Sequence, residues 1–91
     1  MDRGEIHERL EAAIDRLASI EHERWAHWQL YMHSKAERRP DGSLILPANL
    51  VAQWSRQIET PYEALTSKER ESDKEQVRRY LPTIVDALTT P

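Results

Sequence analysis

The first third of the chain carries apolar residues with helical periodicity. At 100° per residue, the apolar side chains between about Glu5 and Arg38 fall on one stripe about 120° wide. No proline or glycine interrupts this segment, so the pattern predicts a single long helix. The stripe consists of Ile6, Leu10, Ala13, Ile14, Leu17, Trp25, Trp28, Tyr31 and Met32.

Such a helix is too long for a compact domain of this size. At 1.5 Å per residue it measures about 50 Å, whereas a globule of 91 residues has a radius of gyration of about 12 Å. Either the helix breaks near Ala18–Ser19, or a second subunit covers its N-terminal half. We expect residues 1–16 to form a helical extension that makes a homo-oligomer, and residues 17–91 to form the helical domain. The apolar seam of the extension is Ile6, Leu10, Ile14 and Leu17.

Prolines and an Asp-Gly pair divide the rest of the chain. The sequence RPDG at 39–42 predicts a turn that ends the first helix, and Leu44–Leu46 predicts a short extended segment. Pro47 suits the first position of a second helix that runs to about Ile58. With only two glycines in the chain, extensive hairpin structure is not expected.

A third helix is predicted from an N-cap at Thr66 to about Leu88. Thr66 and Glu69 have the spacing of a capping box, and Pro82 should kink or split the helix. The predicted fold class is therefore all-α: a small helical bundle with one long N-terminal helix, a shorter middle helix and a Pro-kinked C-terminal helix.

The composition excludes several classes of function. With 13 Lys+Arg against 16 Asp+Glu the net charge is −3, so nucleic acid is not an expected partner. The absence of cysteine excludes disulfides, thiolate catalysis and cysteine zinc sites. No apolar run approaches the roughly 20 residues of a membrane span, and the N-terminus lacks a signal-peptide core. We expect a cytoplasmic protein that does not contact a membrane.

The motifs do not favour catalysis. No serine lies in a strand–turn–helix elbow, and no glycine-rich phosphate loop is present. His22 and His27 lie about 140° apart on a helix, too far apart to share a metal ion. We expect neither enzyme activity nor a metal or cofactor.

Charged residues interrupt the apolar stripes of two predicted helices. Glu21 and Arg24 share the azimuth of the first stripe, and their spacing lets them pair. The stripe of the third helix, extended backward, passes through Asp73, Lys74 and Arg70. Charge on a core face is costly unless it is paired. The pattern therefore indicates either a structural ion-pair network or a polar-walled pocket, whose aromatic walls would be Trp25, Trp28 and Tyr62.

Two stretches resemble the ryanodine-receptor repeat (RyR) domain. The first, LASIEHERWA at 17–26, is similar to the family's LA…H..WA helix. The second, PYEALTSKERESDK at 61–74, is similar to its PY..L...EK..D turn and helix start. The similarity spans roughly residues 17–82. It departs from the family at 29–32, where QLYM continues the helix in place of a GW.YG segment.

The resemblance implies a small helical module that binds nucleotide-derived ligands. Prokaryotic and phage members of this family are similar to sensors in signalling and antiviral-conflict systems, and a phage member would act as a ligand sponge or an inhibitor of host defence. The positions of this chain that match the family's motifs are His22, Trp25, Tyr62 and Asp73.

Two functional hypotheses follow. In the first, Trp25 and Tyr62 stack on a nucleotide or related phosphorylated metabolite, Arg24 and Lys74 bind phosphate, and Asp73 orients Arg24 or accepts from the ligand. In the second, the chain is a protein–protein adaptor or an inhibitor of a host defence complex, and it uses the N-terminal seam or the Leu30 side of the first helix. The predicted ligand-binding residues are Glu21, His22, Arg24, Trp25, Trp28, Tyr62, Asp73 and Lys74.

Overall fold

The computed structural model describes residues 1–89 and confirms the all-α class. Its helices are α1 (Arg3–Ala12), α2 (Ile14–Lys35), α3 (Ala48–Glu59), α4 (Ser67–Arg78) and α5 (Leu81–Thr89), with a 3-10 turn, η1 (Tyr62–Ala64), before α4. A small hairpin of β1 (Glu37–Arg38) and β2 (Leu44–Ile45) separates α2 from α3. Among the described residues, none of the helices combines the length and the hydropathy of a membrane span.

The expected single N-terminal helix is broken at Ala13. This residue leaves the helical region (φ −96°, ψ 6°) and donates its backbone N–H to the carbonyls of Leu10 and Glu11. The expectation of an unbroken helix is wrong, and the break lies before the alternative position at Ala18–Ser19. Ala13 is 1% exposed and is the only buried residue among those described. The break therefore coincides with the one buried position among the described residues, and helical periodicity does not record such packing.

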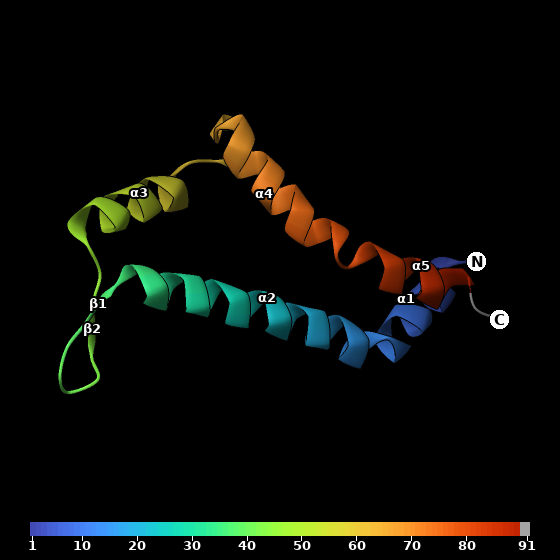
Figure 1. The fold of residues 1–91 in the computed structure, drawn as a ribbon. Helices are drawn as coiled ribbons and strands as arrows, with labels where there is room; N and C mark the ends of the chain where they lie inside the picture. The colour runs from blue at the N-terminus through green and yellow to red at the C-terminus, as the bar shows by residue number, and fades with distance from the viewer. Residues whose placement is uncertain (90–91) are drawn as a thin grey trace.

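The break turns α1 onto α5 (Figure 1). Ile6 and Leu10 on α1 are half-buried, as are Ile84 and Leu88 on α5. Helix α1 thus does not project as an uncovered extension, because α5 of the same chain lies against it. Ile14, at the start of α2, remains exposed.

The segment after α2 forms a hairpin that the sequence analysis does not predict. Helix α2 ends at Lys35 and not at Arg38, and β1 pairs antiparallel with β2, with Glu37 opposite Ile45. The predicted turn is confirmed: Gly42 has φ +91°, which glycine adopts without strain. Asp41 Oδ1 accepts hydrogen bonds from the backbone N–H and the hydroxyl of Ser43, at 2.9 and 2.6 Å.

The predicted boundaries of the later helices are largely confirmed. The Thr66 hydroxyl accepts from the backbone N–H of Glu69 (3.2 Å), and the Glu69 carboxylate accepts from the backbone N–H of Thr66 (3.0 Å), which completes the capping box. The predicted third helix is split into α4 and α5, with Pro82 in the first turn of α5, where its missing N–H costs nothing. Pro47 lies at the N-cap position, one residue before α3 begins and not at its first helical position as predicted, and it makes no side-chain cap.

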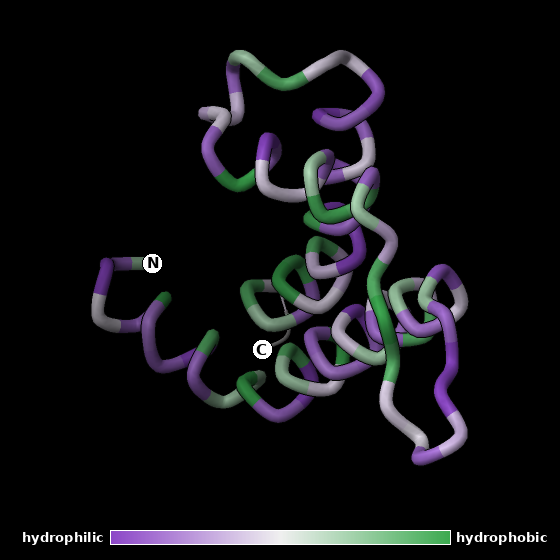
Figure 2. The backbone as a smooth tube through the Cα atoms, turned by 90° about the vertical axis from the view of Figure 1, so that its left-hand side faces the viewer, coloured by the Kyte–Doolittle hydropathy of each residue, from purple (hydrophilic) through white to green (hydrophobic). Residues whose placement is uncertain are grey.

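The helices form an open frame rather than a closed bundle. In Figure 1, α1 and α2 form one arm, α4 and α5 form the other, and α3 connects them at the end opposite the α1–α5 contact. Figure 2 shows hydrophobic positions interspersed with hydrophilic ones along the helices. The molecule measures 53 × 34 × 18 Å, with a radius of gyration of 17.9 Å. Apolar packing is concentrated at the α1–α5 contact and at an aromatic cluster between α2 and α3.

Candidate functional site

A cleft of about 660 Å³ lies between α2, α3 and α4. Cavities of roughly 300–1,000 Å³ are typical of small-molecule sites. Helix α2 contributes Arg24, His27, Trp28 and Tyr31, and α3 contributes Gln53, Trp54 and Gln57. The third wall comes from α4 and from Leu65, which precedes the N-cap of α4. The residues of α4 in this wall are Lys68, Glu69, Ser72, Asp73 and Gln76.

Three aromatic rings line the part of the cleft between α2 and α3. Trp28 and Trp54 meet edge to face, with centroids 5.3 Å apart and an interplanar angle of 70°. Trp28 also stacks on Tyr31, three residues later on the same helix face, at 5.7 Å and 28°. Trp28 and Tyr31 nevertheless remain exposed. Ring faces that are held in place and still reach solvent are able to stack on a planar ligand.

The predicted Glu21–Arg24 pair is confirmed and extends to a third residue. Arg24 donates two hydrogen bonds to the Glu21 carboxylate, one of them from Nε at 3.1 Å. The Tyr80 hydroxyl donates to the same carboxylate and so connects α2 to the α4–α5 junction. Arg24 and Tyr80 lower the pKa of Glu21 to about 2, and the hydrogen bond to Glu21 raises the pKa of Tyr80. Glu21 is therefore anionic at neutral pH, and its partners are within the chain.

A second carboxylate joins α3 to α4. Glu69 accepts from Arg56 at 2.6 Å and from the Gln57 side chain, while it also caps α4. Arg56, then Gln57 and Thr66, lower the pKa of Glu69 to about 2. This interaction fixes the position of α3 relative to α4. The sequence analysis recognises the capping role of Glu69 but not its partner on α3, because that contact joins residues distant in sequence.

Two charged side chains of the cleft remain available for a ligand. Within residues 1–89, Lys68 and Asp73 form no ion pair or hydrogen bond. Arg24 and Glu69 also line the cleft, but their charges are already paired. The cleft therefore offers one unpaired cation and one unpaired carboxylate beside its aromatic rings.

The structure brings together three of the eight predicted site residues, Arg24, Trp28 and Asp73. The other five do not line the cleft. His22 and Trp25 stack on each other at 6.0 Å, with Trp25 54% exposed. Lys74 lies 3.9 Å from Glu71, Tyr62 is exposed in η1, and Glu21 is engaged by Arg24 and Tyr80.

Of the three predicted aromatic wall residues, only Trp28 lines the cleft, and Tyr31 and Trp54 take the place of Trp25 and Tyr62. Trp25 and Trp28 share one stripe, but they differ by about 60° in azimuth, and only the Trp28 edge of the stripe faces α3. Trp54 of α3, which is not among the predicted site residues, supplies the opposing ring. His27, Tyr31 and Lys68 are also missed, because sequence alone does not show which helix faces converge.

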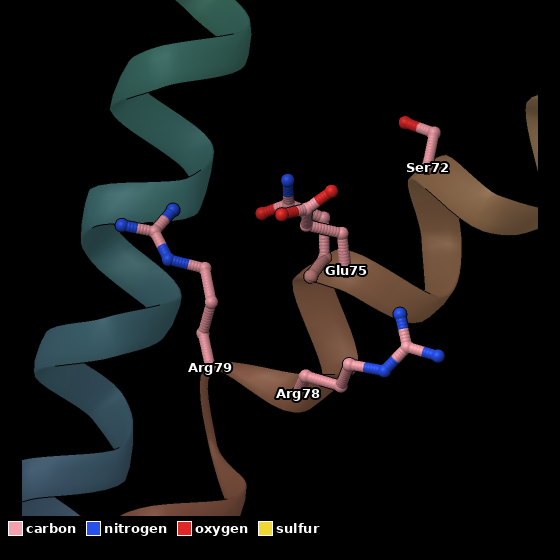
Figure 3. A pocket seen from close by; sticks show the side chains of 5 residues that line it. Ser72, Glu75, Arg78 and Arg79 are labelled. Carbon is pink, nitrogen blue, oxygen red and sulfur yellow. The ribbon is translucent and has the colours of Figure 1, made fainter.

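A more open hollow of about 470 Å³ lies over the C-terminal half of α4. Figure 3 shows Arg79 extending toward α2, whereas Arg78 extends away from it. Arg79 lies 3.9 Å from Glu23 of α2, and Arg78 pairs with Glu71 at 2.9 Å. The lining of this hollow has no aromatic ring, and both of its arginines are paired. The cleft between α2, α3 and α4 is therefore the stronger candidate for a ligand site.

The described side chains do not form a metal site. Among the described residues, no group of three or more His, Asp or Glu side chains is placed to hold a metal ion.

Comparison of the chain with protein-family models, with curated proteins and with solved structures gave no match. The resemblance to the RyR repeat therefore depends on the two sequence motifs at 17–26 and 61–74.

Proposed function

We propose that the chain is a non-catalytic binding module whose α2–α3–α4 cleft takes a nucleotide-derived or similarly phosphorylated small ligand. The observation that carries this proposal is the juxtaposition, in one ligand-sized cleft, of three exposed or partly exposed aromatic rings with an unpaired lysine. The RyR resemblance implies the same ligand class, in a signalling sensor or a phage ligand sponge.

The chemistry of the cleft assigns a role to each group. Trp28, Tyr31 or Trp54 stacks on the planar ring of the ligand. Lys68 binds its phosphate, and Arg24 adds charge-assisted donation from the guanidinium that Glu21 holds in position. Asp73 accepts from a ribose hydroxyl or an exocyclic amine. Compared with the sequence hypothesis, Lys68 replaces Lys74.

Thermal unfolding with a panel of ligands tests the proposal. The panel contains nucleoside mono- and diphosphates, cyclic mono- and dinucleotides, and ADP-ribose. A ligand at 100 times its Kd stabilises the folded state by about 2.7 kcal/mol. Chromatography of the mixture should return the ligand unchanged. The proposal is refuted if no member of the panel raises the unfolding temperature.

Two pairs of variants locate the binding site. Lys68→Ala should weaken binding at least about tenfold by removing the phosphate partner, whereas Lys74→Ala, on the same helix but outside the cleft, should leave Kd within about twofold. Ligand quenching of tryptophan fluorescence should persist in Trp25→Phe and diminish in Trp54→Phe. Equal effects of the two lysine variants would place the ligand elsewhere.

A protein–protein adaptor or inhibitor is the second candidate function. Leu30 favours it, because this side chain is 73% exposed and lies on α2 about 160° from Trp28, away from the cleft. Leu30→Glu should abolish capture of a protein partner and leave ligand binding intact. Lys68→Ala should do the reverse if the ligand-binding proposal is correct.

A further inference from the structure

The charges around the α2–α3–α4 cleft balance one another. Among the described residues, two cations and two carboxylates line it: Arg24, Lys68, Glu69 and Asp73. Outside the lining, Glu21 neutralises Arg24 and Arg56 neutralises Glu69. His27 also lines the cleft and counts as neutral at pH 7. A ligand therefore meets the donors of two cations but only one positive charge that the chain has not already balanced.

Helix α4 places its one cation and its two carboxylates in a definite order. At 100° per residue, Lys68 lies at one edge of the helix face that lines the cleft, and Asp73 lies about 140° away at the other edge. Their positions along the helix axis differ by about 7.5 Å. Glu69 lies between them in azimuth, one turn before Asp73. A phosphate bound by Lys68 therefore has carboxylates, and no further cation, beside it on α4.

Neither the helix N-terminus nor the nearest other lysine adds a second anion site. The Glu69 carboxylate already accepts from the backbone N–H of Thr66, and the Thr66 hydroxyl accepts from that of Glu69. These groups occupy the positive end of the α4 dipole, which otherwise attracts phosphate. Lys35 lies 5.5 Å from the centroid of the Tyr31 ring and is not part of the cleft lining.

The remaining polar groups of the cleft are neutral and free to bind a ligand. Gln53, Ser72 and Gln76 line it, and within residues 1–89 their side chains form no hydrogen bond. Amides and hydroxyls both donate and accept, so they suit the edge of a base or the hydroxyls of a sugar. The lining thus provides neutral partners for most of a nucleoside and one unbalanced cation for its phosphate.

We propose that the cleft selects a nucleotide with a single negative charge, carried by a phosphodiester, over nucleotides that end in a phosphate. The inference rests on the proposed function, because it refines the ligand class of the same site. A phosphodiester has one charge, which Lys68 balances, whereas a terminal phosphate is nearly doubly charged above pH 7. Each added charge is repelled by Asp73 in a cleft where like charges interact more strongly than in bulk water. The 3′,5′-cyclic mononucleotides have the required chemistry.

Calorimetric titration with nucleotides of increasing charge tests the selection. For adenine, guanine, cytosine and uracil, the 3′,5′-cyclic monophosphate is compared with the 5′-monophosphate and the 5′-diphosphate at about pH 8, where histidine is neutral. For the base that binds most tightly, the cyclic form should bind at least about tenfold more tightly than the 5′-monophosphate, and the diphosphate more weakly still. Equal or reversed affinities overturn this inference and leave the proposed function standing. Failure of every nucleotide to bind refutes both.

Two variants separate charge from shape, because cyclic and open phosphates also differ in shape. Asp73→Asn removes the unpaired carboxylate at nearly constant size and should reduce the preference for the cyclic form by at least about threefold. The ratio of the two affinities is compared, so a hydrogen bond lost to both ligands cancels. Glu75→Gln, on α4 but outside the cleft, should leave the preference unchanged. Both positions are exposed, so both variants should fold. An unchanged preference in Asp73→Asn, or an equal loss in Glu75→Gln, overturns the assignment.

Discussion

Enlarging Ala13 should destabilise the fold more than its small side chain suggests. Ala13 is 1% exposed and occupies the break between α1 and α2. Leucine would add three carbon atoms to a site that is already covered, and overpacking of this kind typically costs about 1–3 kcal/mol. The cost arises because α1 cannot lie against α5 unless the chain turns tightly at this residue.

Thermal denaturation of Ala13→Leu measures this effect. Each kcal/mol should lower Tm by about 4–8 °C for a chain of this size, with all samples at one protein concentration. Ala12→Leu is the control, because its side chain is exposed one residue earlier and the change should stay within about 0.5 kcal/mol. If the two variants are equally stable, Ala13 is not enclosed, and the α1–α5 contact does not fix the break.

Three other predictions follow from contacts between or within helices. Thr66→Ala removes the capping box of α4 and should cost about 1 kcal/mol in urea unfolding; no change would mean that the cap is dispensable. Trp54→Leu removes the edge-to-face pair with Trp28 and should cost about 0.5–1.5 kcal/mol beyond its buried area, with Trp25→Leu as the exposed control. Glu21 has a folded pKa of about 2, below its ordinary 4.5, so its stabilising contribution should be complete above pH 4.5 and decline as the pH falls through 2. Glu21→Gln should flatten that decline, and an unchanged pH profile would contradict the pairing.

Local signals in the sequence predict most of the fold. The capping box at Thr66, the turn at Gly42 and the split near Pro82 each depend on residues within a few positions of one another, and the structure contains all three. The break at Ala13 has no such signal, since alanine is a strong helix former. The hairpin also has no clear local signal. The polar residues of β1, Glu37 and Arg38, are as compatible with the end of a helix as with an edge strand.

The candidate site was predictable in part. The Glu21–Arg24 pair follows from spacing on one helix, and the structure contains it. The cleft requires knowledge of how α2, α3 and α4 converge, which sequence patterning does not give. For this reason the sequence pattern groups Trp28 with Trp25, which does not line the cleft, and does not identify Trp54 and Lys68, which do.

The contact between α1 and α5 gives the chain a nearly circular path. Figure 1 shows α1 and α5 together at one end of the molecule, while the β1–β2 hairpin lies at the opposite end. Exposed turns with few packed side chains are the positions that tolerate new termini best. A circular permutant of this chain that joins α5 to α1 by a short flexible linker and opens at Gly42 should preserve every helix. It would also move affinity tags or fluorophores to the hairpin.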